Sequence, residues 1–327
     1  MTGRPSEFEF IDTMLAPLAA GYAGALGLGD DAAVIDVRPG YQLAITKDAL
    51  VAGVHFFSDD PPEDIAAKML RVNLSDLAAM GARPIGYLTA LMLPDWIDRE
   101  WLERFVAGLA ADQRQFDVHL VGGDTASTPG PLALTVTAFG DVRAGQALLR
   151  SGARPGDRVV VSGTIGDGAL GLAVIQGRLT GLSDPDRQYL IGRYRRPRPR
   201  VGLGLALAGV ASAAIDVSDG LIADLGHICA RSNAGARIRA QDLPLSPAAR
   251  AALDRDPDLI ETVLTGGDDY ELCLAVPAAR RGSLPALASG QDAPLTDIGE
   301  IVTGAGVVAI GKDGRGLRFK ATGFRHF

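Results

Sequence analysis

Residues 63–80 read EDIAAKMLRVNLSDLAAM, with two prolines directly before them and a glycine directly after. Proline before and glycine after a periodic apolar segment are typical of helix boundaries, so we predict a helix here. Ile65, Met69 and Val72 follow one face of that helix, and Asp76 occupies the next position along it. A carboxylate that faces the interior destabilises a fold by several kcal/mol unless it is paired or binds a metal. Asp76 is therefore predicted either to ligate a metal or to form a buried ion pair with an arginine.

Strand and helix patterns alternate on both sides of this helix. Residues 41–46, 85–93 and 132–139 are apolar, β-prone runs, and residues 98–116 have helical periodicity. The turn-rich segment SGARPGD (151–157) precedes a further strand-like run, RVVVSG. This alternation predicts an α/β or α+β fold.

The same alternation continues through the second half of the chain. Helices are predicted near 167–177, 185–194, 199–209 and 219–232, and strands near 270–276 and 295–303. A length of 327 residues favours two domains. We place the boundary near 145–150, and expect an N-terminal domain over residues 1–148 and a C-terminal domain over residues 149–327.

The composition is that of a globular protein, with 47% hydrophobic and 22% charged residues. A net charge of −7 argues against nucleic acid as the main partner, because that affinity depends on Lys and Arg. No run approaches the roughly 18 apolar residues of a membrane span, and acids stand where a signal peptide would have its apolar core. Cys229 and Cys273 give neither a disulfide framework nor zinc spacing. We expect a reduced, cytoplasmic setting without a membrane partner.

Phosphate chemistry in this chain would need a source of positive charge other than a Walker A loop. None of the four lysines precedes Ser or Thr, as that loop requires. GAGVVA (304–309) matches a dinucleotide-binding pattern, but no helix pattern follows it, so we predict a turn between strands. The basic run YRRPRPR (194–200) contains prolines and is predicted to be a solvated turn at a helix C-terminus. A divalent metal is the remaining candidate.

Aspartates stand beside glycines or at the ends of predicted segments. They are Asp31 in GDDAAV, Asp48 after the strand 41–46, Asp76, Asp124 in GGDT directly after VHLV, Asp216 at a strand end, and Asp219 at a helix start. Some have ordinary explanations: Asp31 fits a turn, Ser218 or Asp219 fits a helix cap, and a lone histidine such as His55 is usually structural. Together, oxygen-only ligands of this kind suit Mg²⁺ bridging to phosphates. The sequence has no His/Cys cluster for zinc and no G-x-S-x-G elbow.

Several of these segments fall in an order and spacing that match a known family. They are GDDAAV (29–34), TKDALVAGVHF (46–56), VNLSDLAAMGARP (72–84), GGDT (122–125), RSGARPGD (150–157), IDVSDGL (215–221), GGDDYEL (266–272) and GFRHF (323–327). In this order they resemble the thiamine-monophosphate kinase family, a branch of the PurM-like superfamily of ATP-using enzymes. VAGVHF and the DYEL segment favour this branch over the aminoimidazole ribonucleotide synthetase, selenophosphate synthetase and hydrogenase maturation branches.

The resemblance implies transfer of the γ-phosphoryl group of ATP to thiamine monophosphate, giving thiamine diphosphate and ADP. It implies a two-domain PurM-like fold, several Mg²⁺ ions and a homodimer. The N-terminal domain would bind ATP and metal, and its sheet would build a barrel-like dimer interface. By motif position, the implied metal ligands are Asp31, Thr46, Lys47, Asp48, Asp76, Asp124, Asp216 and Asp219. The implied ATP contacts are Gly123, Asp124, Arg150 and Ser218, and the implied substrate contacts are His55, Asp268 and Phe324.

The chain departs from the family pattern at three positions. Lys47 stands where Ser or Thr is usual, which is harmless if that position ligates metal through its backbone carbonyl. Val106 stands where a Tyr near the adenine is common, so that contact is not carried over. Asp268 replaces a commoner Glu, which makes its side chain one methylene shorter.

The chemistry agrees with the resemblance, because the attacking phosphate oxygen is already anionic near pH 7. We therefore assign no general base. Mg²⁺ held by aspartates would screen the repulsion between two polyanions and keep the attack in line. Two alternatives remain: another PurM-like ATP-dependent synthetase, and a non-enzymatic nucleotide-binding partner protein. A partner protein need not keep buried carboxylates such as Asp76, which argues against the second.

Overall fold

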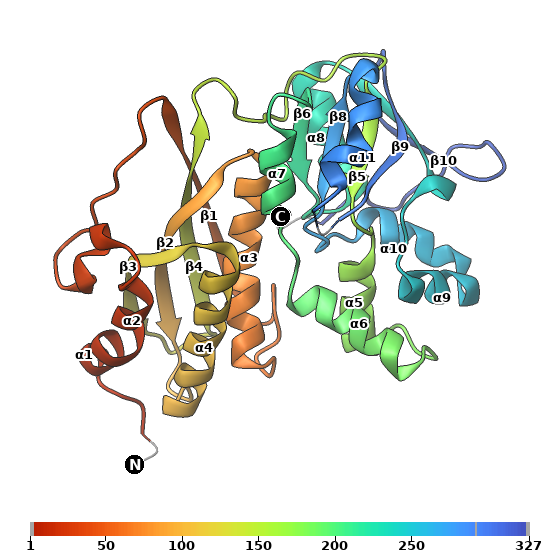
Figure 1. Ribbon diagram of the computed structural model, residues 1–327. Helices are drawn as coiled ribbons and strands as arrows, with labels where there is room; N and C mark the ends of the chain where they lie inside the picture. Colours follow the sequence, from red (N-terminus) through yellow and green to blue (C-terminus); the bar gives the residue numbers. More distant parts are fainter. Residues whose placement is uncertain (1–2, 292, 325–327) are drawn as a thin grey trace. The chain divides into compact units, whose positions relative to one another are not determined.

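The computed structural model describes residues 3–291 and 293–324 (Figure 1). It divides into two compact units: the first comprises residues 1–77 and 82–145, and the second comprises residues 78–81 and 146–327. Each unit is built around its own sheet, which has four strands in the first unit and six in the second over the described residues.

The sheet of the first unit has the strand order β1-β4-β2-β3. Its strands are β1 (Tyr41–Val51), β2 (Arg83–Leu93), β3 (His119–Ser127) and β4 (Ala133–Arg143). β4 runs antiparallel to both β1 and β2, whereas β3 is parallel to β2. β1 and β3 are therefore the edge strands of this sheet within the unit.

Two helices, α3 (Pro62–Ala79) and α4 (Arg99–Phe116), cover one face of this sheet (Figure 1). Alternate side chains of each strand point to this face, and Tyr87 of β2 is fully buried there. α4 approaches α3 closely at Gly108, where a Cβ atom would lie 2.7 Å from the carbonyl oxygen of Glu63. The two helices therefore form one tight layer over the strands.

The segment before β1 packs around the β3 edge of this sheet, where it contacts both β3 and helix α4. It contains α1 (Glu7–Phe10), the π-helical η1 (Ile11–Leu15), α2 (Ala16–Ala19) and the 3-10 segment η2 (Ala23–Leu28). Ala25 joins a buried cluster with Val121 of β3 and Phe139 of β4. This segment reaches the sheet around β3, and β1 carries exposed apolar side chains at Leu43 and Ile45.

The sheet of the second unit has the order β10-β7-β9-β5-β8-β6. Its strands are β5 (Arg158–Ser162), β6 (Ala213–Asp216), β7 (Gly235–Arg239), β8 (Leu272–Val276), β9 (Leu295–Val302) and β10 (Gly306–Ile310). β10 and β7 are parallel, and the other pairs are antiparallel.

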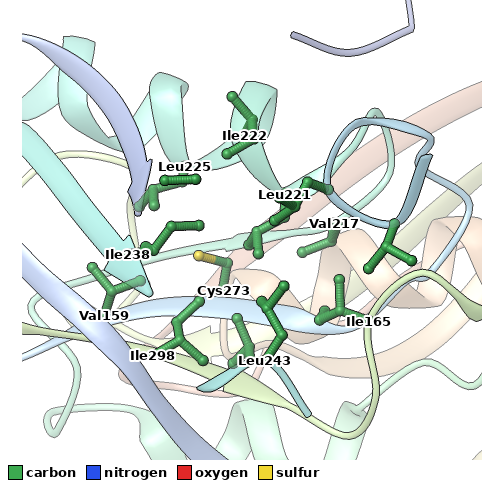
Figure 2. Close-up of a cluster of buried hydrophobic side chains, with 14 of the residues drawn as sticks. Val159, Ile165, Val217, Leu221, Ile222, Leu225, Ile238, Leu243, Cys273 and Ile298 are labelled. Atoms are coloured by element: carbon green, nitrogen blue, oxygen red, sulfur yellow. The ribbon is translucent and has the colours of Figure 1, made fainter. Parts of the chain in front are cut away.

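Helices cover both faces of this second sheet. They are α5 (Asp167–Ile175), α6 (Asp184–Arg195), α7 (Val201–Leu207), α8 (Leu221–Ser232), α9 (Pro247–Arg255), α10 (Ile260–Thr265) and α11 (Leu284–Ala288), with 3-10 turns η3 (Ala240–Asp242), η4 (Pro257–Leu259) and η5 (Ala278–Ser283). Val159 of β5 lies in the larger core, with Leu221 and Leu225 of α8 (Figure 2). Its neighbour Val160 lies in the opposite core, with Leu203 of α7. The alternation of one strand therefore supplies both cores.

The α/β architecture predicted from the alternating patterns is confirmed, but two local predictions about the site were wrong. Thr46 to Asp48 lie in the middle of β1, because its pairing with β4 continues from Tyr41 to Val51. The GGDT segment lies inside β3 instead of after a strand, because its parallel pairing with β2 continues to Ser127.

Two further predictions need correction. Ser218 and Asp219 do not open a helix, because α8 begins at Leu221 and they lie in the loop before it. The YRRPRPR run is not simply a solvated turn: Tyr194 is buried, and Arg200 forms an ion pair with the buried Glu271. The GAGVVA match is a turn that leads into β10, as predicted.

The patterns did not predict the helical segments before β1, helices α9 and α10, or the short strands β7 and β10. Each is short, and five-residue strands carry little periodicity of their own. Within the described residues, no helix is both long and apolar enough to cross a membrane.

Candidate active site

An acidic pair lies between β1 and α3 in the first unit. Thr46 and Asp48 are two residues apart on β1, so their side chains share the face of the sheet that α3 covers. The hydroxyl of Thr46 donates to the carboxylate of Asp76 on α3. Burial, together with the charge of Asp76, raises the pKa of Asp48 to about 6. A cation between the two carboxylates would relieve both effects.

Lys47 lies on the opposite face of the same strand. Its Nζ donates to the hydroxyl of Thr135 on β4 at 3.3 Å. A lysine ammonium carries no lone pair for a metal, and this one points away from the face that holds Asp48. Any metal contact at position 47 therefore has to use the backbone carbonyl.

A cavity of about 580 Å³ opens on that opposite face. Four of the predicted site residues line it: Asp31, Lys47, Gly123 and Asp124. Gly123 is required by close strand packing, since a Cβ atom there would lie 2.3 Å from the carbonyl oxygen of Thr89. The charged side chains in its lining are one ammonium, Lys47, and the carboxylates of Glu7, Asp30, Asp31 and Asp124, so a phosphate-bearing ligand there would need a bound cation.

His55 follows β1 in a turn and is partly buried. Its Nδ1 accepts the N–H of Val51 at 3.0 Å. A neutral imidazole that accepts at Nδ1 carries its proton on Nε2. In this state His55 is a donor at Nε2, so it can bind an acceptor oxygen but cannot take a proton from one.

The second unit holds the remaining predicted residues. Asp216 ends β6 and is only 3% exposed. Ser218 and Asp219 follow in a loop that is fixed from α8, because the N–H groups of Asp219 and Gly220 both donate to Asp224 Oδ2 at 3.1 Å. The loop therefore has a set conformation before any ligand binds.

The GGDDYEL loop runs beside this one. The N–H of Asp268 donates to the carbonyl of Ser218 at 2.9 Å, and that of Tyr270 donates to the carbonyl of Val217 at 2.8 Å. The N–H of Phe324 donates to the carbonyl of Asp219 at 3.0 Å. Main-chain bonds thus bring together a predicted ATP contact, a predicted metal ligand and two predicted substrate contacts.

Two predicted features remain, one of which extends beyond the described residues. Arg150 is exposed in the segment before β5, and its carbonyl accepts the Ser232 hydroxyl at 3.4 Å. The predicted motif GFRHF is described only at Gly323 and Phe324, and its last three residues lie outside the described part of the chain.

Sequence reasoning missed several buried polar residues around these loops. They are Asp224, Asp269, Glu271 and Arg193, none of them more than 3% exposed. Asp224 was detectable, because it interrupts the apolar stripe of helix α8 as Asp76 interrupts that of α3. The other three carried no periodic signal, since they lie in a loop or pair across long sequence separations.

Among the residues that the structure describes, no three His, Cys, Asp or Glu side chains converge closely enough to hold a metal ion by themselves. The acidic pair of Asp48 and Asp76 is the best fit. Mg²⁺ commonly takes only one or two carboxylates and completes its shell with phosphate oxygens and water.

Comparison with known proteins agrees with this geometry. The family model of the AIR synthase related protein, N-terminal domain, matches residues 29–142, and that of the C-terminal domain matches residues 154–312. The two sheets and their acidic loops therefore define a two-domain protein of the AIR synthase related, PurM-like class.

The relatives are more specific. Thiamine-monophosphate kinase of Caulobacter vibrioides is 46% identical over 325 residues, which are 98% of this chain and 91% of that protein. The crystal structure of thiamine-monophosphate kinase from Stenotrophomonas maltophilia K279a has a TM-score of 0.85 at 47% identity, covering 97% of this chain and 99% of that one. A structure of AaThiL complexed with AMPPCP and TMP has a TM-score of 0.78 at 31% identity, covering 98% and 97%. The chain belongs to the thiamine-monophosphate kinase family.

Proposed function

We propose that this protein transfers the γ-phosphoryl group of ATP to thiamine monophosphate (TMP), giving thiamine diphosphate and ADP. The observation that carries the proposal is the junction of two loops in the second unit. There Ser218 and Asp219, the expected nucleotide and metal residues, are bonded through their main chain to Asp268 and Phe324, the expected substrate residues. A phosphoryl transfer needs donor and acceptor held side by side in this way.

Magnesium is the cofactor that the acidic residues fit. Asp48 and Asp76 would hold it, because their mutual repulsion and burial favour a cation between them. Bound Mg²⁺ supplies charge neutralisation for the phosphates of ATP. The further proposed ligands are Asp31, Thr46, Asp124, Asp216 and Asp219, with Lys47 through its carbonyl.

The proposed ligand contacts follow the two substrates. Gly123, Asp124, Arg150 and Ser218 would contact ATP, and His55, Asp268 and Phe324 would contact TMP. Thiazolium is a cation, so the face of Phe324 and the carboxylate of Asp268 suit it. His55 would donate from Nε2 to the TMP phosphate, in keeping with its bond to Val51.

We propose no general base. The acceptor phosphate loses its second proton near pH 6, so its oxygen is nucleophilic at neutral pH without help. The tautomer of His55 agrees with this, because Nδ1 is occupied by the N–H of Val51 and Nε2 carries the proton.

We infer that the working form is a homodimer. Leu43 and Ile45 of β1 and Leu88 of β2 are exposed large hydrophobic residues. All three share one face of the sheet, because Lys47 and Leu88 both stand opposite Thr137 of β4. The unpaired edge of β1 offers a second copy a place to extend the sheet. ATP as co-substrate and two free, buried thiols support a cytoplasmic setting.

The test is an assay of the purified full-length protein with Mg-ATP and defined acceptors. ADP release and thiamine diphosphate formation, followed by chromatography, should depend on TMP in a 1:1 ratio. Substrates of aminoimidazole ribonucleotide and selenophosphate synthetases should release no ADP. Free thiamine should be a very poor acceptor, because its hydroxyl needs a base. Efficient turnover of any of these in place of TMP would refute the assignment.

A further inference from the structure

The loop 266–271 carries an unusual backbone. Gly267, Asp268 and Tyr270 have φ angles of +74°, +61° and +52°. Glycine enters this region freely and Asp more readily than most residues, whereas Tyr enters it at a cost in free energy, so surrounding contacts must hold the loop in this conformation. Asp268 is the proposed TMP contact. Whatever holds its backbone therefore bears directly on substrate binding.

Asp269, between the two left-handed residues, is the first of these contacts. It is 1% exposed, and its two carboxylate oxygens accept the N–H groups of Gly166 at 2.7 Å and Gly168 at 3.0 Å. These groups form the start of helix α5, and they act against the burial that raises the pKa of Asp269 to about 8. The two segments are in close contact and leave no room for a side chain at Gly168, because a Cβ atom there would lie 2.1 Å from the carbonyl oxygen of Asp268. The start of α5 is thus clamped against the loop.

Glu271 fixes the other end of the loop. Its carboxylate accepts from Ser162 Oγ at 2.6 Å, Arg193 Nη2 at 3.0 Å and Arg200 Nε at 2.7 Å. Arg193 Nη2 also donates to the backbone carbonyl oxygen of Asp269 at 3.2 Å, so it joins the main chain at Asp269 to the carboxylate of Glu271. Charge-assisted bonds among buried groups hold a geometry rigidly. This network also gives the basic run after α6 a role that its sequence did not suggest.

We propose that Asp269, Glu271 and Arg193 are positioning residues, which brace the left-handed backbone of Asp268 so that its carboxylate meets TMP. The proposal rests on the proposed kinase function and adds residues that need not touch either substrate. Loss of these residues should affect the two substrates unequally. The loop of Ser218 and Asp219, which would contact the nucleotide, is held separately by its hydrogen bonds to Asp224. Loss of the Asp269 brace should weaken TMP binding more than ATP binding.

The test is Asp269→Asn in the full-length protein. The amide puts an N–H donor against one of the two backbone donors, so one bond of the brace is lost. We expect KM for TMP to rise about tenfold or more, with KM for Mg-ATP changed by less than about twofold. Calorimetry with TMP alone should show the same loss, without relying on turnover.

The matched control is Asp157→Asn in the same unit. Asp157 is also buried, and its Oδ2 accepts the N–H of Arg154 at 3.0 Å and the hydroxyl of Ser212 at 2.6 Å. It should lower the melting temperature while leaving both KM values unchanged. If folded Asp269→Asn keeps the wild-type KM for TMP, or if both KM values rise together, the positioning role is wrong.

If Asp269→Asn does not fold, a milder variant tests the positioning role instead. Arg193→Lys keeps the charge, but its side chain is shorter than the one that places Nη2 against both the Asp269 carbonyl and Glu271, so it should raise KM for TMP by a smaller factor in the same selective way. Unchanged TMP affinity in this variant would overturn the proposal. Failure of the kinase assignment is separate, since wild-type protein would then release no ADP with TMP.

Discussion

The carboxylate of Asp76 stands on the interior face of α3, in line with the buried Ile65 and Met69. Its contact with the Thr46 hydroxyl and its effect on Asp48 place it in the acidic pair between helix and sheet. Removal of its charge should therefore act on cation binding before it acts on the fold.

Asp76→Asn tests this at a single residue. The amide keeps the shape and an acceptor for Thr46, so the melting temperature should change by only a few degrees. Turnover should fall by about a hundredfold or more, because a charge of the proposed metal site is lost. Steady-state kinetics with a titration of Mg²⁺ measure the turnover, and a thermal melt measures the melting temperature. A large loss of stability with near wild-type turnover would instead indicate a structural ion pair.

His55→Asn tests the base-free chemistry. Asparagine can still accept the Val51 N–H through its side-chain oxygen, so the turn should persist. We expect weaker TMP binding. The rise of turnover from acid pH to about 7 should remain, because it belongs to the second ionisation of the substrate phosphate. If the acid limb disappears while activity survives, His55 is the titrating group and a base is required.

The two faces of strand β1 carry side chains with different proposed roles. On β1, Thr46 and Asp48 point to α3, whereas Lys47 points to the cavity on the other side. The same strand therefore supplies oxygen atoms to the proposed cation site and an ammonium group to the cavity, as the alternation of a strand requires.

One buried carboxylate, Asp141, connects β4 to β2 and to the segment before β1 through ion pairs. Asp141 of β4 is 1% exposed and accepts from Arg38 Nε at 2.6 Å and Arg83 Nε at 3.2 Å. Burial alone would raise the pKa of Asp141, but the two guanidinium groups outweigh it and hold the pKa below the ordinary value of 3.8. The ionised form is therefore the one that stabilises the fold.

Asp141→Asn should destabilise the protein by about 2 kcal/mol at pH 7. A lowered carboxyl pKa contributes stability above the unfolded value, and this contribution is lost as the pH falls through the lower, folded value. The difference between wild type and variant should thus shrink below about pH 4. Urea unfolding at pH 7 and pH 3 measures it, and an equal difference at both values would contradict the ionic origin.

The dimer proposal belongs to the scale of the whole molecule. Ile45 is 64% exposed on β1, and an aspartate there would place a charge in the proposed interface. In sedimentation, wild-type protein should be a dimer and Ile45→Asp mainly a monomer. Val308→Asp on β10 is the matched control, since Val308 is 47% exposed in the other unit and should leave the dimer intact. A monomeric wild type would rule out this interface.

The sequence by itself determined the α/β class, the amphipathic helix with Asp76 on its apolar face, and the order of the acidic motifs. These are local properties, because periodicity and turn residues act over a few positions. The order of motifs also sufficed to indicate the family, since each short stretch constrains the chain independently of the packing.

Only the tertiary structure decided how far the strands run and what braces the loops. The pairing of β1 with β4 carried that strand past Thr46 and Asp48, and separated Lys47 from them by alternation. The bonds of Glu271 to Ser162 and Arg193 join residues 109 and 78 positions apart. No local pattern encodes such pairs, because the free energy of a buried carboxylate depends on which distant donors the fold brings to it.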